Sequence, residues 1–185
     1  MIYPVTIIGH PTLRKRAEEV DQNYPDLEKI IDNMFETMYE SDGVGLAAPQ
    51  INKSIRIIVI DGAPMAEDDP DLKDFKKVLI NPEMVDEWGE EKLFNEGCLS
   101  IPNIREDVNR PSEIKLKYYD RDFNLKEEEF KGTQARIIQH EYDHLEGILF
   151  TDRISPLRKK ILKSKLLGLS KGKFKVSYRT VLGKK

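Results

Sequence analysis

The sequence predicts an α+β fold, in which antiparallel β-sheets pack around a central helix and a further helix lies near the C-terminus. Two observations support this prediction. The β-branched runs gather ahead of one helical segment in the second half of the chain, and strands and helices do not alternate strictly. Grouped strands favour antiparallel pairing, whereas strict alternation would indicate parallel strands with helical crossovers. The 185 residues suit one domain that is long enough to bury a core.

The first predicted elements are an amphipathic helix and a strand. The helix is expected over residues 26–40, where apolar residues recur at spacings of three and four and so share one side. These residues are Leu27, Ile30, Ile31, Met34, Phe35 and Met38. Residues 55–61 form a β-branched run between polar residues and predict a strand. The stretch 62–77 is rich in proline and acidic residues, so we expect a surface insertion there.

The next predicted elements are three strands. One begins near Lys77 and should end near Pro82, because proline cannot donate a hydrogen bond to a β-ladder. Residues 113–119 and 124–131 predict two further strands, joined by the turn at 120–124.

Two helices are predicted to follow, each from its capping residues. The first has Thr133 as its predicted N-cap and extends to about Leu145, before Gly147. The second begins at Ser155, which precedes a first-turn proline, and ends near Gly168.

Composition and charge exclude several classes of protein. No apolar run reaches the roughly 18–20 residues of a membrane-spanning helix. The N-terminal basic cluster follows an apolar stretch instead of preceding it, unlike a signal peptide, so we expect a cytoplasmic protein without membrane contact. Cys98 is the single cysteine, which excludes an internal disulfide.

Residues 153–185 hold twelve of the 30 basic residues and no acidic one, which indicates either an anionic partner or a solvated, frayed end.

The most informative chemical signal is an HExxH pattern on the predicted central helix, from His140 to His144. Two histidines four residues apart lie on one face of a helix and can bind a single metal ion. A divalent metal lowers the pKa of a bound water, and the Glu141 carboxylate is placed to accept that proton. Because the chain has only three histidines, we favour this interpretation over two exposed histidines on a helix.

A catalytic metal site usually has a third protein ligand and one open position. Downstream of His144 the acidic residues are Glu146, which is too close in the chain to reach the same ion, and Asp152, which stays possible. Upstream, Cys98 could complete a set of one thiolate and two imidazoles. We therefore favour a metal site made of Cys98, His140 and His144 over a buried structural cysteine.

Three segments together resemble the signature motifs of the peptide deformylase family. They are Gly43-Val44-Gly45-Leu46-Ala47-Ala48-Pro49-Gln50, Glu96-Gly97-Cys98-Leu99-Ser100 and Gln139-His140-Glu141-Tyr142-Asp143-His144. The resemblance covers about residues 1–168, which we expect to form a single catalytic domain followed by a basic C-terminal tail at 169–185. It implies a metal-dependent hydrolase that removes the formyl group from the N-terminal formyl-methionine of new proteins and releases formate.

The resemblance also implies roles for individual residues. Glu141 would be the general base, and Gln50 with the backbone N–H of Leu99 would hold the developing oxyanion. Gly45 would pair with the main chain of the substrate, and Gly43 would allow that chain a close approach.

The methionine side chain of the substrate needs an apolar pocket. Val44 and Ile137 are predicted to line this pocket. Ile138 could also line it, or it could pack in the protein core. The resemblance implies Fe²⁺ as the native ion, and the same donors accept Zn²⁺, Ni²⁺ or Co²⁺. Family members contact the ribosome through their C-terminal helix, so the basic segment 153–185 is predicted to dock on ribosomal RNA.

Charged residues beside the motifs are predicted to orient the metal ligands. Metal-binding histidines usually donate their second N–H to an acceptor, and Glu96 is the candidate. Arg110 would hold Glu96 or Asp143 by a bidentate pair. An ordinary surface ion pair is the alternative.

Some features depart from the common family pattern. Thr133 and Arg136 stand where apolar residues are frequent, Asn103 stands where glycine is frequent, and the insertion at 62–77 is longer than in some members. These departures affect what the resemblance implies about the pocket and the substrate preference, and they leave the implied metal site and general base unchanged.

Two other functions stay open at this point. A zinc endopeptidase would share the HExxH pattern but would not need Cys98 as a ligand. A ribosome- or RNA-binding module with a structural metal would need a fourth protein ligand, and the sequence offers no obvious candidate.

Overall fold

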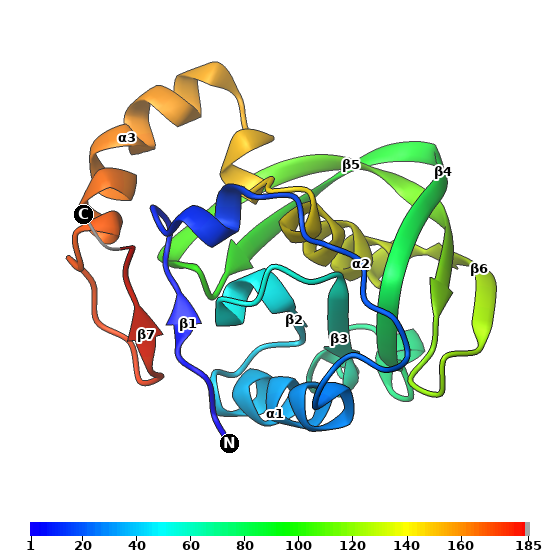
Figure 1. Cartoon of the computed structure of the whole chain (residues 1–185). Helices are drawn as coiled ribbons and strands as arrows, with labels where there is room; N and C mark the ends of the chain where they lie inside the picture. The colour runs from blue at the N-terminus through cyan, green and yellow to red at the C-terminus, as the bar shows by residue number, and fades with distance from the viewer. Residues whose placement is uncertain (184–185) are drawn as a thin grey trace.

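The computed structural model describes residues 1–183 and contains three α-helices and seven strands within them (Figure 1). In chain order they are β1 (Val5–Thr6), α1 (Leu27–Glu40), β2 (Gly45–Ala47), β3 (Ile57–Asp61), β4 (Lys76–Cys98), β5 (Ile101–Tyr119), β6 (Leu125–Lys131), α2 (Gly132–Leu145), α3 (Pro156–Ser170) and β7 (Thr180–Val181). Residues 184 and 185 of the predicted basic tail lie outside the described part of the chain.

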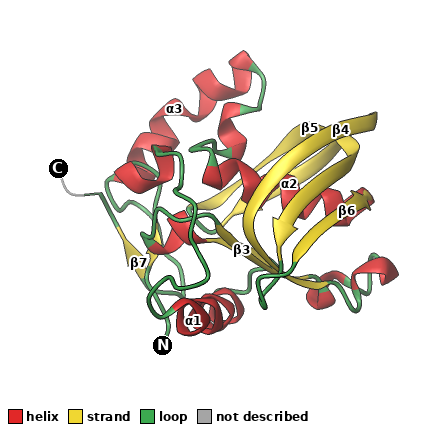
Figure 2. Ribbon diagram, turned by 45° about the vertical axis from the view of Figure 1, so that its right-hand side comes forward, coloured by secondary structure: helices red, strands yellow, loops and turns green. Residues whose placement is uncertain are grey.

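The larger sheet has the order β2-β3-β4-β5-β6, and every neighbouring pair is antiparallel. Successive side chains of a strand point to opposite faces of its sheet. On β3, Ile58 and Ile60 belong to the core shared with α2, whereas Ile57 and Val59 belong to the core shared with α1. Figures 1 and 2 show α2 lying under the arch of β4 and β5. The predicted α+β fold with a central helix is confirmed.

The strand expected to end near Pro82 is longer than predicted. β4 continues for 23 residues, as far as Cys98. Its pairing with β5 shifts register between Ile80 and Glu83, and Asn81 has a φ of 49°. A bulge at this point accommodates Pro82, which has no backbone N–H, and pairing with β5 continues after it.

The prediction of a surface insertion at 62–77 is wrong for part of that stretch. Two short 3₁₀ turns, η3 (Ala63–Met65) and η4 (Pro70–Leu72), fold it back on the sheet. Leu72 and Phe75 are buried in the core between the sheet and α2. A segment rich in proline and acidic residues thus still supplies two core side chains.

The two helix starts differ in their caps. Ser155 caps α3 as predicted, since its side chain accepts a hydrogen bond from the Arg158 N–H. Thr133 is not a cap, because α2 already begins at Gly132, which has a φ of 58°, and Lys131 precedes it without a side-chain cap. α3 ends at Ser170, two residues beyond the predicted end.

Two short segments near the ends of the described chain form a second, two-stranded sheet that was not predicted. β1 and β7 pair in parallel, with Val5 opposite Thr180 and Thr6 opposite Val181. An antiparallel arrangement therefore describes the larger sheet only. Among the described residues, no helix combines the length and the apolarity that crossing a bilayer requires.

Candidate metal centre

Three side chains that can ligate a metal meet between the end of β4 and the C-terminal half of α2. Cys98 is the last residue of β4, and His140 and His144 lie one helical turn apart on α2. Their ligand atoms all lie within 4.8 Å of one another, and Cys98 Sγ is 3.3 Å from His144 Nε2. Within residues 1–183, no other trio of His, Cys, Asp or Glu side chains converges in this way.

The alternative third ligand, Asp152, is engaged elsewhere. Its carboxylate accepts two hydrogen bonds from Arg14, and Glu146 pairs with two other arginines. The fold therefore brings Cys98, and neither acidic residue, to the histidine pair.

The residues present fit a divalent transition metal. One thiolate and two imidazoles are accepted by Fe²⁺, Zn²⁺, Co²⁺ and Ni²⁺, and three protein ligands leave one position for water or substrate. Glu141 is buried, and its Oε2 has no hydrogen-bond partner among the described residues. A buried polar atom without a partner is costly, so this oxygen is suited to accept a hydrogen bond from a molecule bound at the centre.

Glu96, on β4, links His140 to a buried arginine. Its Oε2 lies 3.4 Å from His140 Nδ1, which leaves Nε2 of that ring for the metal. Arg110 donates to both carboxylate oxygens of Glu96, at 2.7 and 3.0 Å. Burial alone would raise the pKa of Glu96, but the hydrogen bonds from His140 and Arg110 lower it to about 2. Glu96 is thus an ionised carboxylate held inside the protein by paired charges.

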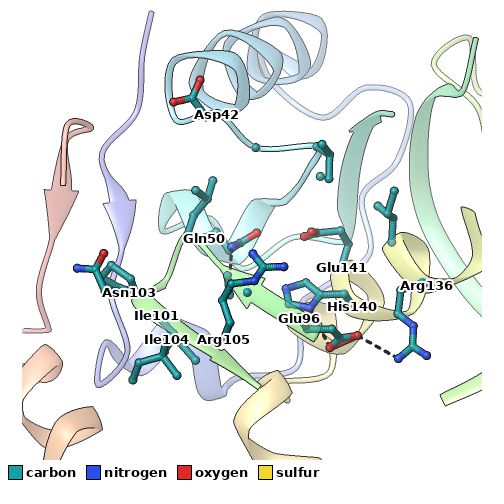
Figure 3. A pocket seen from close by; sticks show the side chains of 18 of the residues that line it. Asp42, Gln50, Glu96, Ile101, Asn103, Ile104, Arg105, Arg136, His140 and Glu141 are labelled. Carbon is teal, nitrogen blue, oxygen red and sulfur yellow. Dashed lines mark hydrogen bonds and ion pairs between the residues drawn. The ribbon is translucent and has the colours of Figure 1, made fainter. Parts of the chain in front are cut away.

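The charge network extends to α2 and to the segment before α3. Arg110 Nη1 donates to Asp143 Oδ2 at 2.8 Å, and Arg153 donates to both oxygens of Asp143. Arg136 approaches Glu96 Oε1 at 3.4 Å, as the dashed line in Figure 3 shows. The sequence indicated the Glu96, Arg110 and Asp143 cluster, but it gave no sign that Arg153 and Arg136 join it.

The side-chain amide of Gln50 has a defined orientation. Gln50 lies on the 3₁₀ turn η2 (Ala48–Ile51) and is 1% exposed. Its Oε1 accepts a hydrogen bond from the Ala47 N–H at 2.9 Å. Its Nε2 is therefore the group that faces Cys98 Sγ at 3.5 Å and Ser100 Oγ at 3.3 Å. The amide presents a donor toward the metal centre.

Glu141 lies against the backbone of Gly45. A Cβ atom at Gly45 would be 2.7 Å from Glu141 Oε1 and 2.9 Å from its Cγ, closer than real Cβ contacts. Desolvation by burial raises the pKa of Glu141 to about 7. A carboxyl group with a pKa near neutrality can both accept and release a proton at physiological pH.

A cavity of about 590 Å³ opens beside these groups, within the usual range for small-molecule sites (Figure 3). Figure 3 shows Gln50, Glu141 and His140 gathered around the same space. The predicted substrate-binding residues Gly43, Val44, Gly45 and Ile137 all line it, as do Cys98 and Leu99. Ile138 is fully buried in the core instead.

Sequence reasoning missed several residues of the cavity wall. Phe94 and Arg105 come from the β4–β5 hairpin, and Val176 and Tyr178 come from the segment after α3. Phe94 and Arg105 lie close to Cys98 in the chain but outside the motif, whereas Val176 and Tyr178 approach the cavity from a distant part of the chain. The Tyr178 hydroxyl donates to the Leu99 carbonyl oxygen at 2.8 Å, and burial raises the pKa of Tyr178 to about 12.

Comparisons with known proteins point to one family. The family model described as polypeptide deformylase matches residues 2–160. A peptide deformylase from Christiangramia forsetii is 50% identical, with 97% of this chain and 95% of that protein covered. The crystal structure of a peptide deformylase from Legionella pneumophila is 38% identical and has a TM-score of 0.80, covering 94% of this chain and 98% of that one. A Met-Ala-Ser-bound class I type b peptide deformylase from Acinetobacter baumannii is also 38% identical, with a TM-score of 0.75 over 83% of this chain and 99% of that one.

Proposed function

Because this chain belongs to the polypeptide deformylase family, we propose that the cavity beside Cys98, His140 and His144 is where the N-formyl group of nascent peptides is removed. The chain is a metal-dependent hydrolase of this family. The observation that carries the assignment of the site is the approach of the Cys98 sulfur, at the end of β4, to an HExxH pair on α2. An endopeptidase with the same helix motif would have no need of that sulfur.

Cys98, His140 and His144 would hold the metal. A divalent ion bound there would supply Lewis-acid chemistry, polarising the formyl oxygen and making water a better nucleophile. We propose Fe²⁺ as the native ion, with Zn²⁺, Ni²⁺ or Co²⁺ as ions that the same donors accept. Metal content after anaerobic purification checks this proposal, which fails if iron is absent and added Fe²⁺ gives no activity.

Glu141 acts as the general base and then as the general acid. Its Oε2, which has no hydrogen-bond partner within residues 1–183, accepts the proton of the water that attacks the formyl carbon. The same carboxyl group then delivers the proton to the leaving amine, so that formate and a free N-terminal methionine depart.

Gln50 and Leu99 stabilise the charge that develops on the formyl oxygen. The proposal for Gln50 is supported by its fixed amide, whose Nε2 lies on the side of Cys98. The Leu99 N–H is the second donor, on the residue that follows the ligand sulfur. Neutral donors that are already oriented stabilise an oxyanion without reorganisation, and losing one typically costs about 3 kcal/mol of barrier.

The substrate main chain is proposed to lie along Gly43, Val44 and Gly45. β2, which begins at Gly45, is an edge strand of the larger sheet, so an extended peptide can add to it. Val44 and Ile137 would contact the methionine side chain. A formyl carbon carries only hydrogen, so a tight site admits it and excludes bulkier acyl groups.

Glu96, Arg110 and Asp143 are proposed to orient the ligands through His140 and α2. Replacing a residue of this kind typically costs 10–100-fold in metal affinity or activity. Normal metal content and normal turnover in both Glu96→Ala and Arg110→Ala would refute the proposal.

The experiment that tests the function compares formyl-Met-Ala-Ser with acetyl-Met-Ala-Ser as substrates under anaerobic conditions. We expect formate release from the first and no cleavage of the second. Glu141→Gln should keep its metal and lose about 10²–10⁴ in kcat. Equal cleavage of the acetylated peptide, or undiminished turnover by the variant, would contradict the assignment.

We also propose that the protein works in the cytoplasm and contacts ribosomal RNA through α3. Apart from Leu162 and Leu169, the side chains of α3 are exposed or partly exposed, and the helix carries several lysines and no acidic residue. Such a helix face suits the phosphate backbone of RNA.

Sedimentation with ribosomes at increasing salt tests this contact. Lys159→Glu combined with Lys163→Glu should weaken association and leave turnover of short peptides unchanged. Lys15→Glu combined with Lys29→Glu makes the same change in net charge elsewhere and should have little effect. Association that is insensitive to salt and to both pairs would exclude an electrostatic contact through α3.

A further inference from the structure

The segment after α3 returns to the metal centre. We call residues 171–183 the C-terminal strap. Its end forms β7 beside β1, and Figure 1 shows the two strands side by side. The Val5 N–H donates to the Arg179 carbonyl at 2.8 Å, and the Ile7 N–H donates to the Val181 carbonyl at 3.0 Å. The strap is therefore fixed at one end by α3 and at the other by β1.

The strap and the N-terminal segment both bind the turn that follows Cys98. Leu99 and Ser100 form this two-residue turn between β4 and β5. The Ile8 N–H, two residues after β1, donates to the Ser100 carbonyl at 2.9 Å. The Tyr178 hydroxyl, two residues before β7, donates to the Leu99 carbonyl at 2.8 Å. The two successive carbonyls of the turn are thus held by the two segments that pair as β1 and β7.

A second contact binds the strap to the start of β5. Asn103 Nδ2 approaches the Lys175 carbonyl at 3.4 Å. Asn103 has a φ of 61°, a conformation that asparagine tolerates better than most residues. Val176 and Tyr178, on either side of Ser177, line the cavity. The strap thus forms part of the cavity wall and also contacts the turn beside the metal centre.

We infer that Tyr178 is a positioning residue for deformylation, which fixes the Leu99 carbonyl and thereby the direction of the Leu99 N–H. This inference rests on the proposed role of that N–H as an oxyanion donor. The carbonyl and the N–H of Leu99 belong to two rigid peptide planes that meet at its Cα, so only two backbone rotations separate them. Fixing the plane of the carbonyl therefore restricts the plane of the donor.

The expected consequence is an effect on kcat. An oxyanion donor stabilises the transition state only if it is aligned before the charge develops. Without the Tyr178 hydroxyl the Leu99 plane would sample other orientations, while the rest of the cavity and the metal ligands would be unchanged. Ground-state binding should then be preserved, and the barrier to hydrolysis should rise.

Tyr178→Phe tests the inference, because it removes only the hydroxyl group. Removing an oxyanion donor typically lowers kcat by about 10²–10³. A donor that is present but less well fixed should therefore lower the kcat of Tyr178→Phe by roughly tenfold. We expect KM within about twofold of the wild-type value and the same metal content per chain. Tyr118→Phe is the matched control, since it removes a 3.0 Å hydrogen bond from a tyrosine hydroxyl to Glu128, outside the cavity lining. It should keep full kcat.

A spectroscopic measurement is independent of turnover. In the zinc-loaded protein, the backbone amide signal of Leu99 should shift or broaden in Tyr178→Phe and stay unchanged in Tyr118→Phe. Formate release by the wild-type protein, and its loss in Glu141→Gln, test the reaction itself, so failure of the proposed function is recognised separately.

Four results would overturn the inference. The first is a kcat for Tyr178→Phe equal to that of Tyr118→Phe. The second is a raised KM with unchanged kcat, which would make Tyr178 a cavity wall only. The third is a loss of bound metal that accounts for the whole decrease in activity. The fourth is an unaltered Leu99 amide signal in Tyr178→Phe.

Discussion

A side chain at Gly45 would displace Glu141, the proposed general base. Since a Cβ there would lie 2.7 Å from Glu141 Oε1, the carboxylate must move in Gly45→Ala. Misplacing a catalytic group by about 1 Å can cost about 10²-fold in rate, so we expect kcat on formyl-Met-Ala-Ser to fall roughly 10- to 100-fold. Steady-state kinetics of the variant checks this prediction.

Gly168→Ala is the matched control for this substitution. Gly168 lies within α3, and the nearest atoms to an added Cβ are at 3.7 Å, an ordinary contact. Alanine should therefore keep full activity and stabilise the protein by about 0.5–1 kcal/mol. Unchanged kcat in Gly45→Ala would show that the base has room to move without consequence.

Residues that carry the chemistry were predictable where helical geometry fixes their separation. His140 and His144 had to share a face of α2, and the shortage of other ligands then pointed to Cys98. Tyr178 and Arg153 were not predictable in the same way. They reach the site from the C-terminal part of the chain, and nothing in their neighbouring residues indicates that approach.

At the scale of elements, the two predicted helix caps should respond differently to alanine. Ser155→Ala removes the side-chain oxygen that accepts from the Arg158 N–H, so it should destabilise the protein by about 0.5–2 kcal/mol. Thr133→Ala should lower the free energy of unfolding by less, because Thr133 lies inside α2 and is not its cap. Urea unfolding of both variants measures the difference, and equal losses would contradict the cap assignment.

Element boundaries were the least predictable part of the fold. Pro82 indicated the end of a strand, yet β4 continues through a bulge because β5 pairs with it on both sides of the irregularity. β1 and β7 were not predicted, since two residues each are too few to form a recognisable pattern. In both cases the strand is defined by the strand that pairs with it, β5 for the length of β4 and the opposite end of the chain for β1 and β7.

At the scale of the whole molecule, Arg110 joins β4, β5 and α2 through two buried carboxylates. Arg110→Met leaves Glu96 and Asp143 without this buried partner, which should destabilise the fold by about 3–5 kcal/mol. Arg121 also pairs with two carboxylates, Glu28 and Asp32, but at the surface. Arg121→Met should therefore cost less than about 1 kcal/mol.

Urea unfolding of chelator-treated proteins compares these two arginines without a contribution from metal loss. Similar effects for Arg110→Met and Arg121→Met would mean that burial of the network adds nothing to stability.

The fold class was predictable from grouped strands and one central helix. The buried network that connects these elements was only partly predictable, because Arg136 and Arg153 join it through the tertiary structure alone.

The central claim is that a sulfur from β4 and two imidazoles from α2 hold one catalytic ion. The most direct test measures formate release and bound metal together in Cys98→Ala after anaerobic reconstitution. We predict that this variant loses most of its bound metal and nearly all formate release from formyl-Met-Ala-Ser. A variant that binds one ion per chain and releases formate at the wild-type rate would contradict the account.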